Sequence, residues 1–299
     1  MPTLTVITPT YNRADCLKKC WASLQAQTNR DFQWLIVDDG STDDTPQTVS
    51  RIKAESGCVQ VDYIQKENGG KHTALNAAHP HIRGKYVLVL DSDDRLVPDA
   101  VSVVLEAWAR YGSDPEVGRI IFLKGYTVEE PICYVRNPDV PLDTLKEPRI
   151  GKTGRDCCDT FRTELFCKYP FPVFPGEKFI GEGAAFFWME LESKGVYINQ
   201  VIYLCEYRED GLTMAGRRMR LRNPRGGMYN SRVYMHPRLP LKKRAAKGLL
   251  YTCYAKCAKV SFRDSLRENP YKLLTVATYL PGALLFRYWK HKYFRGEDK

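Results

Sequence analysis

Residues 86–94 read YVLVLDSDD, an apolar run followed at once by three carboxylates and a hydroxyl. The apolar run is typical of a strand buried in a sheet, so the acidic residues stand where that strand ends. Three adjacent carboxylates repel one another, and a bound cation relieves that repulsion. Their hard oxygens favour Mg²⁺ or Mn²⁺, which proteins often share with a substrate diphosphate. We therefore expect a metal–diphosphate site here. The alternative is a solvated turn or a helix cap, a role that suits Asp94.

Strand-like and helix-like segments alternate around this stretch. Strands are predicted at residues 4–8, 32–37, 59–64, 85–90 and 120–123, and helices at residues 15–27, 42–55, 73–78 and 98–111. This alternation predicts a parallel, doubly wound sheet, in which ligands bind beyond the carboxyl ends of the strands. Asp38 and Asp39 also follow a predicted strand, so both acidic groups should lie at the same edge of the sheet.

The second half of the chain has a different pattern. Residues 126–180 are rich in Pro, aromatic and charged residues and predict hairpins and long loops. A helix is predicted at 182–193, a short strand pair at 196–203, a loop at 207–212 and mostly helix beyond residue 223.

The net charge of +10 is unevenly distributed. Residues 1–210 hold 24 Lys+Arg and 31 Asp+Glu, a balance of −7, and residues 211–299 hold 21 and 4, a balance of +17. The stretch LLFRYWKHKYFR at 284–295 interleaves aromatic and basic residues. Such a composition favours the surface of an anionic membrane over nucleic acid or a merely solvated helix face.

Several targeting and redox features are missing from the sequence. The N-terminus has no signal-peptide pattern, and the apolar stretch near 273–286 is short for a spanning helix and contains Pro281-Gly282. The ten Cys residues show no zinc spacing, which indicates free thiols in a reducing compartment rather than a metal or redox site. We expect a cytoplasmic protein that binds peripherally to the inner face of the cell membrane.

Two further turns carry candidate ligand-binding residues. After the first strand, Tyr11 offers a flat face for stacking on a nucleobase and Pro9 would shape the wall beside it. Asp39 could accept hydrogen bonds from a ribose or a base. Lys71 follows two glycines that let a ligand approach the backbone, and it supplies a compact positive charge. The first turn has no Gly-rich dinucleotide fingerprint, which argues against a nicotinamide enzyme, and the stretch at Lys71 lacks the spacing of a Walker motif.

The stretches VITPTYN at 6–12, VDDGSTD at 37–43, GK at 70–71 and LDSDD at 90–94 occur in this order. Together they resemble the family-2 glycosyltransferases of the GT-A fold, of the type that makes bacterial cell-surface polysaccharides, over residues 3–110. The resemblance implies a Rossmann-like, mixed and mainly parallel sheet flanked by helices, here with a C-terminal helical extension. It also implies that Pro9, Tyr11 and Asp39 hold the nucleoside, usually uridine, and that Asp91, Ser92 and Asp93 form a DxD motif with Asp93 as the metal ligand.

The resemblance extends less closely into the second half. The stretch PGEKFIGE at 175–182 is similar to the segment that carries the catalytic base, an Asp of a Glu-Asp pair in many members. That pair is absent here, so Glu182 is the expected base, with Glu177 and Glu190 as rivals. Arg208 lies in a stretch that resembles a loop over the diphosphate; the alternative is an ordinary surface ion pair. Asp156 and Asp159 fall where relatives line the acceptor site.

The resemblance implies an inverting, metal-dependent transfer of a sugar from a UDP-sugar or similar donor to a glycan or lipid-linked saccharide. Residues 1–125 would bind the donor, residues 126–215 would supply the acceptor site and the base, and residues 216–299 would form a basic, membrane-associated extension. Two alternatives remain: a sugar nucleotidyltransferase, and a catalytically silent membrane-bound adaptor with the same fold.

Overall fold

A computed structural model describes residues 1–147, 149–151, 156–206 and 212–293 of the chain. The chain forms two compact units. The first contains Met1–Pro170 and Trp188–Tyr207, and the second contains Phe171–Phe187 and Arg208–Lys299. The three functional segments expected from the sequence stay a prediction.

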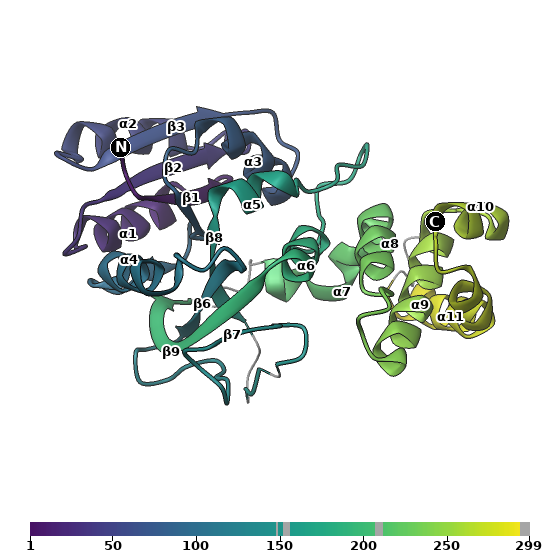
Figure 1. Ribbon diagram of the computed structural model, residues 1–299. Helices are drawn as coiled ribbons and strands as arrows, with labels where there is room; N and C mark the ends of the chain where they lie inside the picture. The colour runs from purple at the N-terminus through teal and green to yellow at the C-terminus, as the bar shows by residue number, and fades with distance from the viewer. Residues whose placement is uncertain (148, 152–155, 207–211, 294–299) are drawn as a thin grey trace. The chain divides into compact units, whose positions relative to one another are not determined.

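The first unit is built on one mixed sheet (Figure 1). The strand order is β3-β2-β1-β4-β8-β6-β9-β5, and β7 pairs with β9. The strands are β1 (Leu4–Thr10), β2 (Phe32–Asp38), β3 (Gln60–Gln65), β4 (Tyr86–Val89), β5 (Arg95–Leu96), β6 (Val117–Gly125), β7 (Pro141–Leu142), β8 (Cys157–Arg162) and β9 (Lys194–Leu204). Strands β3, β2, β1 and β4 run parallel, as predicted, whereas β8 is antiparallel to both β4 and β6. The predicted mixed sheet flanked by helices is confirmed.

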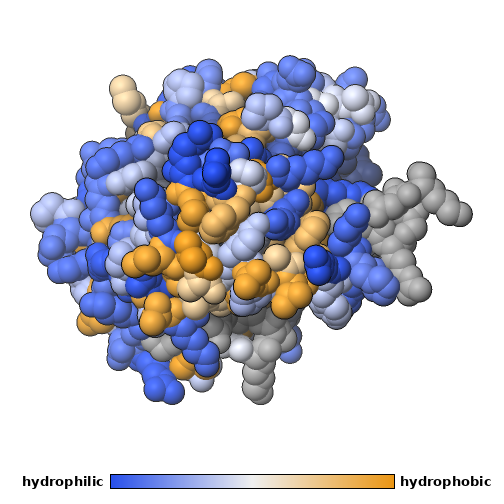
Figure 2. All heavy atoms as spheres, turned by 90° about the vertical axis from the view of Figure 1, so that its right-hand side faces the viewer, coloured by the Kyte–Doolittle hydropathy of each residue, from blue (hydrophilic) through white to orange (hydrophobic). Residues whose placement is uncertain are grey.

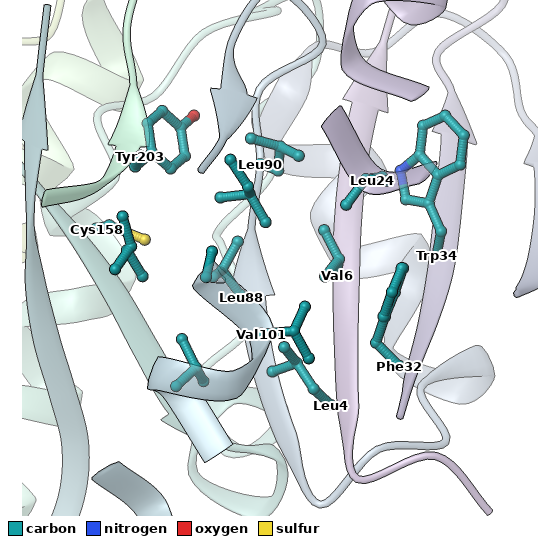
Figure 3. Close-up of a cluster of buried hydrophobic side chains, with 14 of the residues drawn as sticks. Leu4, Val6, Leu24, Phe32, Trp34, Leu88, Leu90, Val101, Cys158 and Tyr203 are labelled. Carbon is teal, nitrogen blue, oxygen red and sulfur yellow. The ribbon is translucent and has the colours of Figure 1, made fainter. Parts of the chain in front are cut away.

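The main core lies between this sheet and three helices, α1 (Ala14–Gln25), α2 (Thr45–Glu55) and α4 (Ala100–Tyr111). Every residue of β1 is buried, which is typical of a central parallel strand covered on both faces. Figure 3 shows Val6 of this strand among side chains from neighbouring strands and helices. The buried indole of Trp34 stacks on Trp21 and donates its N–H to Thr8, so its polar atom is satisfied inside the core.

Two shorter helices pack elsewhere on the sheet of the first unit. Helix α3 (Lys71–Ala78) contacts β1 and β2, and a 3₁₀ turn at His79–His81 follows it. Helix α5 (Thr163–Lys168) contacts β4 and β8. Gly70 directly precedes α3 with φ of 96°, a conformation that favours glycine, so this residue allows the sharp entry into the helix.

Two predictions for the second half were wrong. Residues 126–180 contain a sheet strand, β8, and helix α5 in addition to loops. Residues 194–204 form one strand, β9, and not a pair of short strands. The pairing of β9 with β6 shifts register at the exposed residues Asn199 and Gln200 and then continues. The strand therefore contains an irregularity of the β-bulge kind and does not divide into two.

The second unit is mostly helical, as predicted beyond residue 223. It contains α7 (Leu212–Arg222), α8 (Pro224–Val233), α9 (Leu241–Cys257), α10 (Phe262–Glu268) and α11 (Lys272–Tyr293), while α6 (Gly183–Glu192) begins in this unit and ends in the first. Trp289, expected at a membrane surface, is instead buried in this helical core, with the Arg217 guanidinium 4.1 Å above its ring. Among the described helices, none is both long and apolar enough to cross a bilayer.

Candidate active site

The acidic residues that follow β4 form a tight turn held by a tyrosine of another strand. The hydroxyl of Tyr203, on β9, accepts the Asp91 backbone N–H at 3.0 Å and donates to Asp94 at 2.8 Å. Asp94 also accepts the backbone N–H of Glu206 at 3.1 Å. Burial, together with the charge of Asp91, raises the pKa of Asp94 to about 6. Asp94 is therefore a buried residue that holds the turn together. It is neither the solvated turn residue nor the helix cap considered for it, and the N-cap residue of α4 is Asp99.

The other two carboxylates of the turn each face a cation. The Lys71 Nζ lies 2.5 Å from an oxygen of Asp91, and the Arg13 guanidinium lies 3.4 Å from an oxygen of Asp93. Burial works against ionisation of Asp91, but Lys71 and Lys124 lower its pKa. The side chains of Asp91 and Asp93 are 31% and 24% exposed, so a ligand can reach both. The predicted residues Lys71, Asp91 and Asp93 thus come together, and Ser92 lies buried between the two acids.

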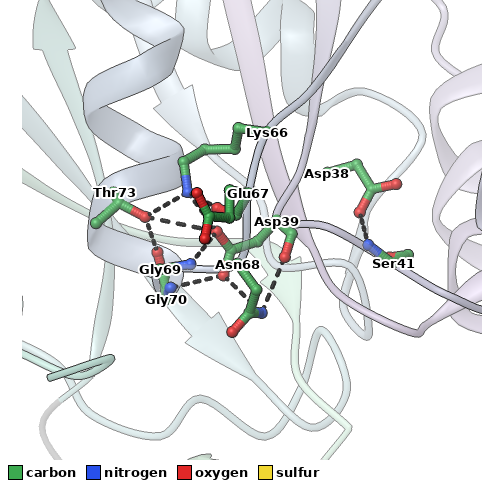
Figure 4. A network of polar contacts seen from close by, with 9 residues as sticks. All are labelled: Asp38, Asp39, Ser41, Lys66, Glu67, Asn68, Gly69, Gly70 and Thr73. Atoms are coloured by element: carbon green, nitrogen blue, oxygen red, sulfur yellow. Dashed lines mark hydrogen bonds and ion pairs between the residues drawn. The ribbon is translucent and has the colours of Figure 1, made fainter. Parts of the chain in front are cut away.

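Asp39 is the centre of a hydrogen-bond network at the carboxyl end of β2 (Figure 4). Its carboxylate accepts bonds from Lys66 Nζ at 2.7 Å and from the Gly69 and Gly70 backbone N–H groups at 3.0 and 2.6 Å. Asn68 donates a further bond at 3.1 Å. Asp39 therefore fixes the loop that leads into Lys71. A base or ribose would share or replace one of these donors, and the nucleoside-binding role of Asp39 stays a prediction.

The loop after β1 is tied to the loop after β2. The Asn12 backbone N–H donates to Ser41 Oγ at 2.8 Å, and the Asn12 side chain accepts the Thr42 N–H at 2.8 Å. Asn12 has φ of 50°, which turns the chain sharply between Tyr11 and Arg13. Tyr11 is 46% exposed and available for stacking, whereas Pro9 is buried within β1 opposite Val37.

The two predicted acceptor residues lie in different surroundings on the β8 side of the sheet. Asp156 is 56% exposed and pairs with Lys124 at 3.0 Å. Asp159 pairs at 3.2 Å with Arg119, whose side chain is only 1% exposed and whose other nitrogen lies 2.9 Å from Glu190. Despite burial, Glu190 and Asp159 raise the pKa of Arg119. The roles of Asp156 and Asp159 toward an acceptor stay predictions.

The three glutamates considered as catalytic bases lie in different surroundings. Glu190 is engaged by buried Arg119. Both oxygens of Glu177 accept backbone N–H groups of α8, from Arg225 at 2.7 Å and Gly226 at 2.8 Å. Glu182 directly precedes α6 and is partly exposed. Glu182 stays our prediction for the base, because the resemblance places the base in the stretch that it ends. Arg208 lies outside the described residues.

Three residues that contribute to these sites were not predicted from the sequence. Arg13 follows directly on the stretch 6–12 that carries part of the resemblance. It stands after a predicted strand, as Asp38–Asp39 and Asp91–Asp94 do, so a cation near these acids could have been predicted. Arg119 is a charged residue inside an apolar strand, which often indicates a buried partner. Tyr203 gave no signal, because a tyrosine in an apolar strand is ordinary and only the fold brings it to Asp91 and Asp94.

The donor set at Asp91 and Asp93 fits a shared metal ion. Within the described part of the chain, no group of three His, Cys, Asp or Glu side chains is arranged to hold a metal by itself. Mg²⁺ and Mn²⁺ do not require such a cage when one or two carboxylates are completed by phosphate oxygens and water. Two adjacent, accessible carboxylates flanked by Lys71 and Arg13 match that mode, since the cations can bind the same phosphates.

Residues 5–165 match the family described as Glycosyl transferase family 2, more than half of the 299 residues, and the protein belongs to this family. An "Uncharacterized glycosyltransferase" of Rickettsia felis is 30% identical over 177 residues, which are 52% of this chain and 29% of that protein. The chain thus spans less than a third of that relative. The GalNAc(5)-diNAcBac-PP-undecaprenol beta-1,3-glucosyltransferase of Campylobacter jejuni is 27% identical to this chain. The match covers 72% of this chain and 68% of the Campylobacter protein.

Solved structures confirm the GT-A fold. The crystal structure of S. aureus TarS 1-349 in complex with UDP-GlcNAc has a TM-score of 0.59 at 19% identity, with 96% of this chain and 80% of that chain covered. The mannosyltransferase PcManGT from Pyrobaculum calidifontis, in complex with GDP-Man and Mn²⁺, has a TM-score of 0.57 at 18% identity. The match covers 98% of this chain and 84% of that chain. At these identities the likeness concerns the fold alone.

Proposed function

We propose that the enzyme transfers a sugar, with inversion, from a UDP-sugar to a glycan or lipid-linked saccharide in cell-surface polysaccharide synthesis. The observation that carries this proposal is the pairing of Asp91 with Lys71 and of Asp93 with Arg13 at the carboxyl end of β4. The Campylobacter relative is named for a lipid-linked substrate, and the TarS structure contains UDP-GlcNAc. Both names support the donor and acceptor classes proposed here.

The donor would be bound by residues of the first unit. Tyr11 would stack on the base, Pro9 would shape the wall beside it, and Asp39 would accept a hydrogen bond from the nucleoside. Asp93, beside Asp91, would hold Mn²⁺ or Mg²⁺, which when bound offsets the negative charge of the leaving diphosphate. Lys71 and Arg13 would exchange part of their contact with the carboxylates for contact with phosphate oxygens.

Glu182 would act as the general base. It takes the proton of an acceptor hydroxyl while that oxygen bonds to the anomeric carbon and the bond from this carbon to the diphosphate breaks. The nucleoside diphosphate leaves with the electron pair of the broken bond, and Arg208 is the residue expected to stabilise it. One base without a carboxylate nucleophile implies inversion, which rests on the family resemblance.

The carboxylate pair can be tested by binding alone. In calorimetry with UDP and Mn²⁺, we expect Asp91→Asn combined with Asp93→Asn to weaken binding at least about tenfold, or about 1.4 kcal/mol, because the two carboxylates are the proposed protein ligands of the ion that the diphosphate shares. Asp99→Asn, an exposed acid before α4, is the matched control and should bind as the wild type does. Undiminished binding by the double variant would remove the basis of the proposed donor site.

The base can be tested by turnover. Glu182→Gln should lower kcat by about 10²–10⁴-fold while UDP binding stays unchanged, because general base catalysis typically contributes that much. Glu129→Gln, on an exposed loop, is the control. Near-normal turnover would reject Glu182 as the base. The product also matters: release of pyrophosphate instead of a free nucleoside diphosphate would identify a nucleotidyltransferase.

The basic extension supports a peripheral position at the cytoplasmic face of the membrane. Residues 211–299 carry the balance of +17 derived above, which suits anionic headgroups. A lipid-linked acceptor would be presented at the same surface. No contact with nucleic acid is proposed.

A further inference from the structure

Helix α11 presents a continuous stripe of apolar side chains to solvent. Leu273, Val276, Leu280, Leu284 and Tyr288 are 88%, 53%, 74%, 64% and 59% exposed. They are spaced three or four residues apart, so they lie on one face of the helix. Figure 2 shows apolar side chains gathered on the exposed face of the helical unit with hydrophilic residues around them. We call these five side chains the α11 stripe.

The inward face of α11 combines small and polar residues with large apolar ones, since Leu274, Leu285 and Phe286 pack partly buried against the helical core. Thr275, Thr278 and Gly282 are among its buried residues. A Cβ on Gly282 would lie 2.6 Å from the Cβ of Thr252 in α9, and a Cβ on Gly248 of α9 would lie 2.6 Å from the Thr278 hydroxyl. The two helices therefore pack closely through small residues.

Helix α11 is therefore apolar on two faces. A helix on the surface of a globular unit normally has one apolar face, which it turns toward the core. Here Trp289 and its apolar neighbours occupy that inward face, whereas three leucines of the stripe point outward. An exposed apolar face of this size indicates a partner surface.

The charges on α11 select the kind of partner. The helix contains no Asp or Glu, and residues 273–286 carry no charge. Lys272 stands at its start, and Arg287, Lys290 and Lys292 stand near its end. A second copy of α11 would bring no acidic group to these cations. The phosphate headgroups of lipids would bring negative charge to these cations, while the leucines contact the acyl chains.

We propose that the α11 stripe lies in the plane of an anionic bilayer, with Leu273, Leu280 and Leu284 inserted at the boundary between headgroups and acyl chains. The cations at the ends of the helix then contact lipid phosphates. This deepens the proposed peripheral location, on which it rests, by naming the surface that binds. It also narrows the sequence-based expectation for residues 284–295, because Trp289 of that stretch is buried in the helical core.

The test measures flotation of the full chain with vesicles of phosphatidylcholine, with and without phosphatidylglycerol, and without any nucleotide sugar. The wild type should float with the anionic vesicles. Leu280→Glu combined with Leu284→Glu should lower its partition coefficient at least about tenfold, since each leucine leaves a favourable apolar environment. Val128→Glu with Val140→Glu, two exposed valines of the first unit, is the matched control and should float as the wild type does.

A second variant tests the charges. Arg287→Gln with Lys290→Gln and Lys292→Gln should lower flotation with anionic vesicles about tenfold or more and leave weak binding to neutral vesicles unchanged. Circular dichroism and an unchanged melting temperature establish that each variant is folded.

The proposal would be overturned if the folded leucine variant floats like the wild type, or if the wild type floats equally with neutral and anionic vesicles. It would also be overturned if the wild type binds no vesicles and is instead a dimer that the leucine substitutions convert to a monomer. Hydrolysis of nucleotide sugar in solution is measured in parallel. Because α11 contributes no proposed catalytic residue, hydrolysis should persist in the leucine variant. Failure of flotation is thereby separated from failure of the proposed transferase function.

Discussion

At the scale of single residues, one tyrosine hydroxyl organises the acidic turn. Tyr203 accepts from Asp91 and donates to Asp94, so one buried oxygen fixes both ends of the turn that carries Asp93. Such a group contributes most when its removal leaves a buried carboxylate without a donor. The position of Asp93 beside Arg13 therefore depends on a residue more than 100 positions further along the chain.

We expect Tyr203→Phe to lower the free energy of unfolding by about 1–3 kcal/mol at about pH 7.5, where Asp94 is ionised and loses a donor. Because Asp94 has a folded-state pKa of about 6, the deficit should shrink as the pH falls to about 5 and the carboxyl takes up a proton. Urea unfolding at both pH values measures this. Tyr134→Phe, at an exposed tyrosine, should show neither effect. A deficit independent of pH would argue against the bond to Asp94.

At the scale of elements, helix α8 shows how a helix start can be completed from elsewhere in the sequence. Its N-cap residue, Asn223, makes no capping bond and instead accepts the N–H groups of Lys178 and Phe179. The carboxylate of Glu177 binds the first free N–H groups of the helix in its place. The segment before α6 and the start of α8 are thus joined by reciprocal bonds, and the negative charge suits the helix dipole.

Glu177→Ala should therefore lower the free energy of unfolding by about 1–2 kcal/mol, the range for loss of an N-terminal cap with its charge. Thermal unfolding followed by circular dichroism measures the change, with Glu55→Ala at the exposed end of α2 as the control. If Glu177 were instead the catalytic base, the substitution would abolish turnover without this loss of stability.

At the scale of the whole molecule, the sheet is completed by strands that the alternating pattern does not reveal. Strand β8 inserts between β4 and β6 and runs antiparallel to both. Arg119, on the neighbouring strand β6, pairs with Asp159 of β8 and Glu190 of α6. These contacts are ion pairs rather than well-aligned hydrogen bonds, and they balance charges inside the first unit.

Removal of the Arg119 guanidinium should destabilise the protein. We expect Arg119→Met to lower the free energy of unfolding by about 3–5 kcal/mol, because two carboxylates lose their buried partner, and Arg119→Lys to recover part of the loss. Urea unfolding measures both variants against Arg110→Met, an exposed arginine of α4. Equal stability of Arg119→Met and Arg110→Met would show that the buried ion pairs contribute nothing.

Several elements could be predicted because their signals are local. The first four strands and their helices were expected within a few residues of their observed bounds, since apolar periodicity and turn residues act over short distances. Strand β8 and the continuous β9 were missed because their pairing partners lie far away in the sequence. The same holds for the contacts of Arg13, Arg119 and Tyr203.

The sequence by itself determined the alternating α/β order, the placement of acidic groups at the ends of β2 and β4, and the concentration of positive charge in the last third. These features depend on neighbouring residues and on composition. Only the tertiary structure decided which cation faces which carboxylate, which tyrosine braces the acidic turn, and which side of α11 is exposed. Those outcomes depend on distances between segments remote in the chain, and packing fixes such distances only when the whole chain folds.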